Sequence, residues 1–391
     1  MFRQSSRAWA RDLILGAGVL CAALALLLYP TEAMEGAKQG LRLCYNVIIP
    51  SLFPFFVLSA LVVELGLAAG LGRMLEGIMR PLFRVDGVCA SAFVLGAIGG
   101  YPVGAKTAID LYQQGMCSKT EAERLLAFCN NSGPAFILGV VGTGVFSSGR
   151  VGLLLYLTHA AASLCVGILF RFYKGAGGRA AGTGVRPQFQ AKRFPAALTR
   201  SVQSAASSAL NICAFVVFFT VTIRLLSLSG AMAALSGALS VLPGLDRVWA
   251  ERLLTGLLEI SSGVWTLSGD GPLPGRLSMA AFLLGWAGIS VHCQVLSFLG
   301  ESGLSAKTYL AGKALHGILA SALTALAVRM VPLEAPAAAL LSGPAADMVA
   351  GPGFGAVLSG SAASAGGLLL GMLLLIRSAG KRSVHRRSGV I

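Results

Sequence analysis

The hydrophobic positions of this chain form long apolar runs instead of alternating with polar positions. A bilayer core is about 30 Å thick, and a helix needs about 20 apolar residues to cross it. The pattern predicts six uninterrupted spans, at Leu13–Tyr29, Val47–Leu65, Arg150–Phe172, Ala206–Leu226, Thr308–Ala327 and Ala362–Ile376. Four further apolar stretches are interrupted, at Gly87–Gly115, Glu121–Phe146, Arg252–Leu267 and Leu277–Gly300. We therefore expect an all-α, polytopic transmembrane bundle with broken or re-entrant helices.

Two of the interrupted stretches resemble one another. The sequence FVLGAIGGYPVGAKTAIDLYQQGMCS starts at Phe93, and FLLGWAGISVHCQVLSFLGESGLS starts at Phe282. Three positions match at one constant spacing, with Phe93, Gly96 and Gly99 corresponding to Phe282, Gly285 and Gly288. Transporters are commonly built from inverted repeats whose discontinuous helices meet near the bilayer midplane. The pattern predicts two inverted halves, and chance similarity of two glycine-rich segments is the alternative.

Composition supports the membrane interpretation. Of the 391 residues, 55% are hydrophobic and 12% are charged, whereas soluble domains carry about 25% charged residues. The net charge of +15 could suit nucleic acid, but the basic residues occur in short clusters between apolar runs, as topology signals do. We expect no nucleic-acid partner. The positive-inside rule places both termini and the basic stretch that starts at Arg171 in the cytoplasm.

These patterns divide the chain into five parts. We expect an N-terminal transmembrane helix (1–30), a first repeat unit (31–172), a basic cytoplasmic linker (173–195), a second repeat unit (196–330), and a C-terminal segment with a glycine-rich stretch, a last membrane helix and a basic tail (331–391). The first apolar run is long and no A-x-A cleavage pattern follows it, so we interpret it as an uncleaved span.

The break after Phe93 predicts a binding site. An unpaired backbone polar group in hydrocarbon costs several kcal/mol, so a break is tolerated only beside other protein or a wet cavity. The helix that restarts after Pro102 presents free N–H groups and a positive dipole end, and Lys106 adds a full charge. The predicted anion-binding residues are Gly99, Gly100, Tyr101, Pro102, Gly104 and Lys106. The alternative is that Lys106 reaches the surface or pairs with Asp110.

Polar residues interrupt the other three stretches as well. The candidates for completing the substrate site are Asn130, Asn131, Ser132, Ser290 and Gln294, because amides and hydroxyls supply both donors and acceptors. Glu259 and His292 are candidates for ion or proton coupling, since ionisable residues within spans mark functional sites. The alternatives are a membrane-edge loop at 130–134, a surface or ion-paired Glu259, and an internally hydrogen-bonded His292. Ser118 and Glu121 predict a capping box.

No enzyme motif stands out, since G-x-x-x-x-G-K-[ST], H-E-x-x-H and G-x-S-x-G are all missing from the sequence. We therefore expect neither catalysis nor a cofactor. The eight cysteines form no C-x-x-C pair, so we expect buried thiols and no metal site. A homo-oligomer is left open.

The segments NVIIPSLFPFFVLSALV, GAIGGYPVGAK, EAERLLAFCNNSGPAFILG, LLEISSG and GISVHCQVLSFL, in this order from Asn46 to Ala327, resemble the YlbJ-type sporulation integral membrane proteins. That family contains the nucleoside recognition or Gate domain, also seen in concentrative nucleoside transporters. The resemblance implies a nucleoside-transporter-like inverted-repeat fold. It also implies transport of dipicolinate, a small planar dianion, into the forespore across the outer forespore membrane. The alternatives are a carrier of nucleosides or other small solutes and a non-transporting sporulation membrane scaffold.

Overall fold

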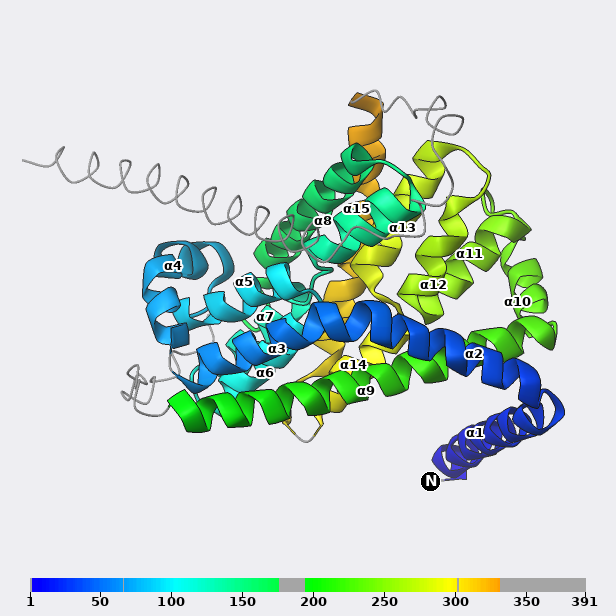
Figure 1. The fold of residues 1–391 in the computed structure, drawn as a ribbon, viewed down its shortest axis with the longest axis horizontal. Coiled ribbons are helices and arrows are strands. Elements are labelled where there is room, and N and C mark those ends of the chain that lie inside the picture. Colours follow the sequence, from blue (N-terminus) through cyan, green and yellow to red (C-terminus); the bar gives the residue numbers. More distant parts are fainter. Residues whose placement is uncertain (1, 66, 176–193, 301, 331–391) are drawn as a thin grey trace, which may run out of the picture.

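The computed structural model describes residues 2–65, 67–175, 194–300 and 302–330, and every regular element in these ranges is helical (Figure 1). This confirms the all-α prediction. Up to residue 175 the elements are α1 (Phe2–Leu28), α2 (Pro30–Leu43), η1 (Cys44–Ile48), α3 (Ile49–Glu64), α4 (Leu67–Phe83), η2 (Gly87–Cys89), α5 (Ala90–Gly99), α6 (Val103–Gln113), α7 (Lys119–Phe128), η3 (Ala135–Val145) and α8 (Gly149–Phe170). From residue 194 they are α9 (Phe194–Leu228), α10 (Ala231–Leu239), α11 (Arg247–Leu258), α12 (Ile260–Trp265), η5 (Thr266–Ser268), α13 (Leu273–Trp286), α14 (Gly288–Leu299) and α15 (Ala306–Met330).

Five stretches of described helix are long and apolar enough to cross a membrane, at Arg11–Leu28, Gly149–Phe170, Phe194–Leu228, Leu273–Leu299 and Ala306–Met330. A sixth results if Gly72–Phe83 and Gly87–Gly99, bent by 96°, form one broken span. Four of the predicted spans thus coincide with parts of α1, α8, α9 and α15, apart from one or two residues at the ends of α1 and α8. The predicted span Val47–Leu65 instead contains the last residue pair of η1 and the 16-residue helix α3, whose apolar part is Phe53–Glu64. The predicted span Ala362–Ile376, most of the predicted linker and the whole segment 331–391 lie outside the described residues.

The helices form two groups that meet at the centre of the molecule (Figure 1). In one group, α15 packs against both α8 and α13, and α7 lies against α15 as well. In the other, α2 and α3 run along the long helix α9. The short helices α6 and α14 contact each other. The second halves of the two similar broken stretches are therefore neighbours in space.

One buried acid ties three elements together. Glu123 of α7 is fully buried and accepts hydrogen bonds from Ser305 N (3.0 Å), just before α15, and from Lys174 Nζ (2.7 Å), just after α8. The bond to Glu123 raises the pKa of Lys174, because a neighbouring carboxylate favours the charged amine. The start of α15 and the end of α8 therefore lie beside the first residues of α7. The predicted capping box of Ser118 and Glu121 is present at that end of α7.

Four interruptions divide the central helices. They separate α5 from α6 at residues 100–102, α7 from η3 at 129–134, α11 from α12 at Glu259, and α13 from α14 at Ala287. Gly100 has a φ of +82°, and a Cβ on it would lie 2.8 Å from Gly133 N. Gly288, also at φ +82°, lies against the α11–α12 break, where a Cβ would be 3.1 Å from Ile260 N. Glycine therefore allows close contact within two pairs of breaks. The α5–α6 break meets the loop at 129–134 in the first half of the chain, and the α13–α14 break meets the α11–α12 break in the second.

Candidate functional site

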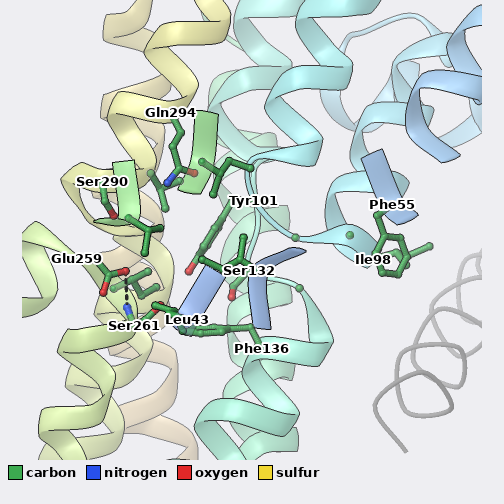
Figure 2. A pocket seen from close by; sticks show the side chains of 18 residues that line it. Leu43, Phe55, Ile98, Tyr101, Ser132, Phe136, Glu259, Ser261, Ser290 and Gln294 are labelled. Carbon is green, nitrogen blue, oxygen red and sulfur yellow. Dashed lines mark hydrogen bonds between the residues drawn. The ribbon is translucent and has the colours of Figure 1, made fainter. Parts of the chain in front are cut away.

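A cavity of about 90 Å³ lies between the two pairs of breaks. Figure 2 shows Tyr101 and Ser132 on one side of it, with Glu259, Ser290 and Gln294 on the other. Apolar residues from four further elements also line the cavity: Leu43 of α2, Ile48 of η1, Phe55 of α3, and Ile212 and Val216 of α9. A cavity of this size holds several water molecules or part of a compact solute. The interrupted helices that the sequence predicts thus line a mainly apolar cavity inside the bundle, with a few polar groups in its wall.

The α5–α6 break supplies Gly99, Gly100 and Tyr101 to the cavity wall. The hydroxyl of Tyr101 is buried and has no hydrogen-bond partner of good geometry. Two other residues predicted for this site, Pro102 and Gly104, are not in the wall. A Cβ on Gly104 would overlap the carbonyl oxygen of Cys129, so this glycine permits close packing of α6 against the end of α7.

The loop at residues 129–134 contributes Ser132 and Gly133 to the wall. The Ser132 hydroxyl is buried beside the Tyr101 hydroxyl and makes no well-formed hydrogen bond, while its backbone N–H donates to His159 Nε2 at 3.0 Å. The two asparagines point elsewhere, since Asn130 Nδ2 donates to the Tyr309 hydroxyl (3.3 Å) and Asn131 Nδ2 donates to the Phe128 carbonyl (3.0 Å). Of the three polar residues predicted here, the structure brings only Ser132 to the cavity.

The opposite wall carries Ser290 and Gln294 of α14, as predicted for these two residues. They are four residues apart on one helix, so they share a face. Ser290, His292 and Gln294 alternate along the chain, so all three would share a face only on an extended segment. The helix instead turns His292 away from the cavity, where its Nδ1 lies 3.0 Å from the Tyr309 hydroxyl. The Ser290 hydroxyl is buried and has no partner among the described residues.

Glu259 lies at the α11–α12 break and is 1% exposed. Its backbone is extended, and its carboxylate accepts hydrogen bonds from Ser261 N (2.9 Å) and Ser262 N (2.7 Å) at the start of α12. This is the geometry of an N-cap residue, in which an anion compensates the positive end of a helix. The carboxylate therefore has a structural role, and it also places one negative charge in the cavity wall.

Lys106 is not in the wall. Its Nζ lies 2.9 Å from Asp110 Oδ2, one turn further along α6. The structure thus favours the alternative in which Lys106 pairs with Asp110, and anion binding by Lys106 stays a prediction. The described residues that line the cavity include no lysine, arginine or histidine, so the only full charge in its wall is that of Glu259.

The most deeply buried basic side chain in the described part of the chain is not among those that the sequence predicts for the site. Lys313 of α15 is fully buried, and its Nζ donates to the Asn130 carbonyl at 2.8 Å. His316 Nδ1 lies 3.5 Å from the same Nζ. The sequence feature that could have pointed to Lys313 is its position three residues before His316 inside the apolar span Thr308–Ala327. A lysine within a span can also lie near a membrane surface, so this feature alone does not indicate a site.

The fold and the cavity define a class: a multi-pass, α-helical integral membrane protein in which paired helix breaks place a few polar side chains in the wall of a mainly apolar cavity. A family model described as Gate, nucleoside recognition, matches residues 46–175, which contain the α5–α6 break and the loop with Ser132. The sporulation integral membrane protein YlbJ of Bacillus subtilis (strain 168) is 33% identical over 319 residues, covering 75% of this chain and 77% of the relative. This chain therefore belongs to the family of YlbJ-type sporulation integral membrane proteins. No solved structure matches it.

Proposed function

We propose that this chain is a membrane transporter of a small organic anion, dipicolinate, and that the cavity between the helix breaks binds the solute. The proposal is carried by one observation: the buried hydroxyls of Tyr101, Ser132 and Ser290, which make no well-formed hydrogen bond among the described residues, lie on opposite sides of the cavity. Buried polar groups are normally hydrogen-bonded, and unpaired ones call for an explanation. Hydroxyl donors on two sides of a cavity suit the oxygens of a carboxylate.

A transport mechanism is suggested by the origin of the cavity walls, because the two sides of the cavity come from different halves of the chain. Residues 99–101 and 132–133 belong to one pair of breaks, and Glu259 and Ser290 belong to the other. Rocking of one half of the chain against the other would open the cavity to each side in turn, as in transporters built from repeats. In this proposal the protein acts without catalysis in the outer forespore membrane, with both termini in the cytoplasm.

A neutral solute such as a nucleoside is the second candidate, and Glu259 favours it. A carboxylate in the wall repels an anion in a low-dielectric site, whereas it can accept a hydrogen bond from a hydroxyl or amide of a neutral solute. The aromatic rings of Tyr101 and Phe136 line the same cavity and would suit a planar ring. The family model's description, nucleoside recognition, agrees with this alternative.

Uptake into proteoliposomes that contain the purified protein tests the proposal. Labelled dipicolinate and, in a parallel series, labelled uridine are offered with a proton gradient, with a sodium gradient or with neither, and the other solute, unlabelled, serves as the competitor. We expect saturable dipicolinate uptake that excess uridine does not inhibit. Uridine uptake without dipicolinate uptake would support the second candidate. Uptake of neither solute under any gradient would contradict both carriers and support the membrane scaffold.

Ser290→Ala links such uptake to the cavity. A lost hydrogen bond to a charged group costs about 1.5–3 kcal/mol, so we expect the KM for dipicolinate to rise at least about tenfold. Thermal stability should stay unchanged, because the Ser290 hydroxyl has no partner in the solute-free protein.

Ser163→Ala is the matched control, since this buried hydroxyl donates to the Phe128 carbonyl at 2.8 Å and does not line the cavity. It should lower stability by about 1 kcal/mol and leave the KM unchanged. Equal effects of the two variants on the KM would contradict the assignment of the binding site.

A further inference from the structure

Beyond the cavity wall, a cluster of buried polar side chains surrounds Lys313 on α15. Lys313 Nζ contacts the Asn130 carbonyl and His316 Nδ1, and it lies 5.9 Å from the centre of the Tyr101 ring. Tyr101 and the loop that contains Asn130 form one wall of the cavity. Lys313 is therefore placed directly behind the proposed solute site, separated from it by an aromatic ring and one loop.

The hydrogen bonds around Lys313 suit a group that changes charge. His316 Nε2 lies 3.0 Å from the His159 carbonyl, to which it can only donate. In the neutral ring Nδ1 is then an acceptor for Lys313. Lys313 thus has two acceptors, which match the two N–H bonds of a neutral amine. The third N–H of an ammonium would find only the face of Tyr101, at the limit of cation–π range.

No carboxylate among the described residues forms an ion pair with Lys313. A charged side chain inside a membrane protein is costly unless it is paired, and such residues mark ion and proton pathways. A solute anion arriving at the cavity would supply the missing negative charge. The anion and a proton on Lys313 would then stabilise each other.

We propose that Lys313 is the proton-binding residue that couples anion transport to proton transport. Binding of the anion adds one proton from solution to the Lys313 amine, which becomes an ammonium, and release of the anion returns that proton. Solute and proton then cross in the same direction. This inference rests on the proposed function, and it assigns to Lys313 the coupling role that the sequence suggests for Glu259 or His292.

Other titratable groups surround Lys313 and must be distinguished from it. They are Tyr309 and His316 on its own helix, His159 from α8, His292 from α14, Cys129 after α7, and Tyr101 from the α5–α6 break. Helix α13 carries one basic residue, Arg276, which donates to the carbonyls of Leu267 and Gly269. Glu259 faces the cavity from the α11–α12 break. Lys313 alone combines full burial, a contact with the cavity loop and the ability to gain a positive charge without losing a bond it already makes.

The test measures protons taken up when dipicolinate binds to the purified protein in weakly buffered detergent solution. The wild-type protein should take up about one proton per bound dipicolinate, and its affinity should strengthen as pH falls. Linkage limits that change to about tenfold per pH unit for one proton. Lys313→Arg keeps a permanent charge, since arginine is not deprotonated in proteins. It should bind dipicolinate without proton uptake and with pH-independent affinity.

Lys313→Met removes the charge at similar length. It should bind dipicolinate at least about tenfold more weakly and also without proton uptake. Lys307→Met is the control, because Lys307 is exposed at the start of the same helix and its loss should change nothing. If Lys313→Met fails to fold, as judged by its melting curve, the arginine variant still decides the question.

Proton uptake that persists in Lys313→Arg would place the proton on another group and overturn the inference. Dipicolinate binding by the wild-type protein without proton uptake would overturn it as well, and would leave the proposed function standing. If the wild-type protein does not bind dipicolinate at all, the proposed function fails for this solute, and the inference fails with it.

Discussion

At the scale of single residues, Glu259 shows how one buried charge can be held in a membrane protein without an opposite charge beside it. Its two carboxylate oxygens each accept a backbone N–H from the start of α12. The helix break creates these free N–H groups, and the same residue satisfies them. The acid therefore belongs to the construction of the break, whether or not it also contacts a solute.

We predict that Glu259→Ala lowers the free energy of unfolding by roughly 1–3 kcal/mol, because two buried N–H groups lose their acceptors. Glu259→Gln retains one acceptor oxygen and should lose less than half as much. Melting curves in detergent measure both. Glu251→Ala is the control, since Glu251 is exposed on the preceding helix. Equal melting temperatures for the alanine variant and the wild-type protein would show that the cap contributes nothing.

At the scale of elements, the α13–α14 break has an unexpected feature. Ala287 adopts a φ of +79°, a left-handed conformation that costs an L-residue roughly 1–2 kcal/mol and that glycine adopts freely. Gly288 is next to it and also has a positive φ. The chain thus turns through two consecutive left-handed residues, of which only one is glycine.

Ala287→Gly should therefore stabilise the protein by up to about 1 kcal/mol. Ala281→Gly is the matched control, because Ala281 is equally buried but lies inside α13. There the same exchange should destabilise by about 1 kcal/mol. Opposite shifts of the two melting temperatures are expected, and destabilisation by both changes would contradict the strained turn.

The positions of the breaks could be predicted from the sequence, whereas the direction of several side chains could not. Glycine and proline at residues 99–102 interrupt a helix by local chemistry, so the break was foreseeable. Lys106 was assigned to the site because it follows that break, but α6 turns it toward Asp110. The contact of Lys313 with Asn130 joins residues 183 positions apart. No local pattern predicts such a pair, because it depends on how α15 packs against α7.

At the scale of the whole molecule, two observations constrain how the chain crosses the membrane. Helix α8 has 22 residues and is about 33 Å long at 1.5 Å per residue, enough to cross a bilayer core. Its ends therefore lie on opposite sides. Glu123 bonds both Lys174 and Ser305 N, so the end of α8 and the start of α15 must lie on the same side.

Charge predicts which side this is. Arg171 and Lys174 follow α8, and the basic stretch to residue 195 continues from them, whereas Arg150 stands alone at the other end. From the positive-inside rule we expect residues 171–175 to lie in the cytoplasm. We predict that a membrane-impermeant thiol reagent applied to intact cells labels Ser147→Cys but not Phe172→Cys or Lys307→Cys. Inverted vesicles should give the reverse pattern, with the parent protein correcting for its native cysteines.

Labelling of positions 147 and 172 from one side would mean that α8 does not cross. Labelling of positions 172 and 307 from different sides would contradict the hydrogen bonds that Glu123 makes to Lys174 and Ser305. The packing of α15 beside α7 depends on these bonds, and the position of Lys313 behind the cavity depends on that packing.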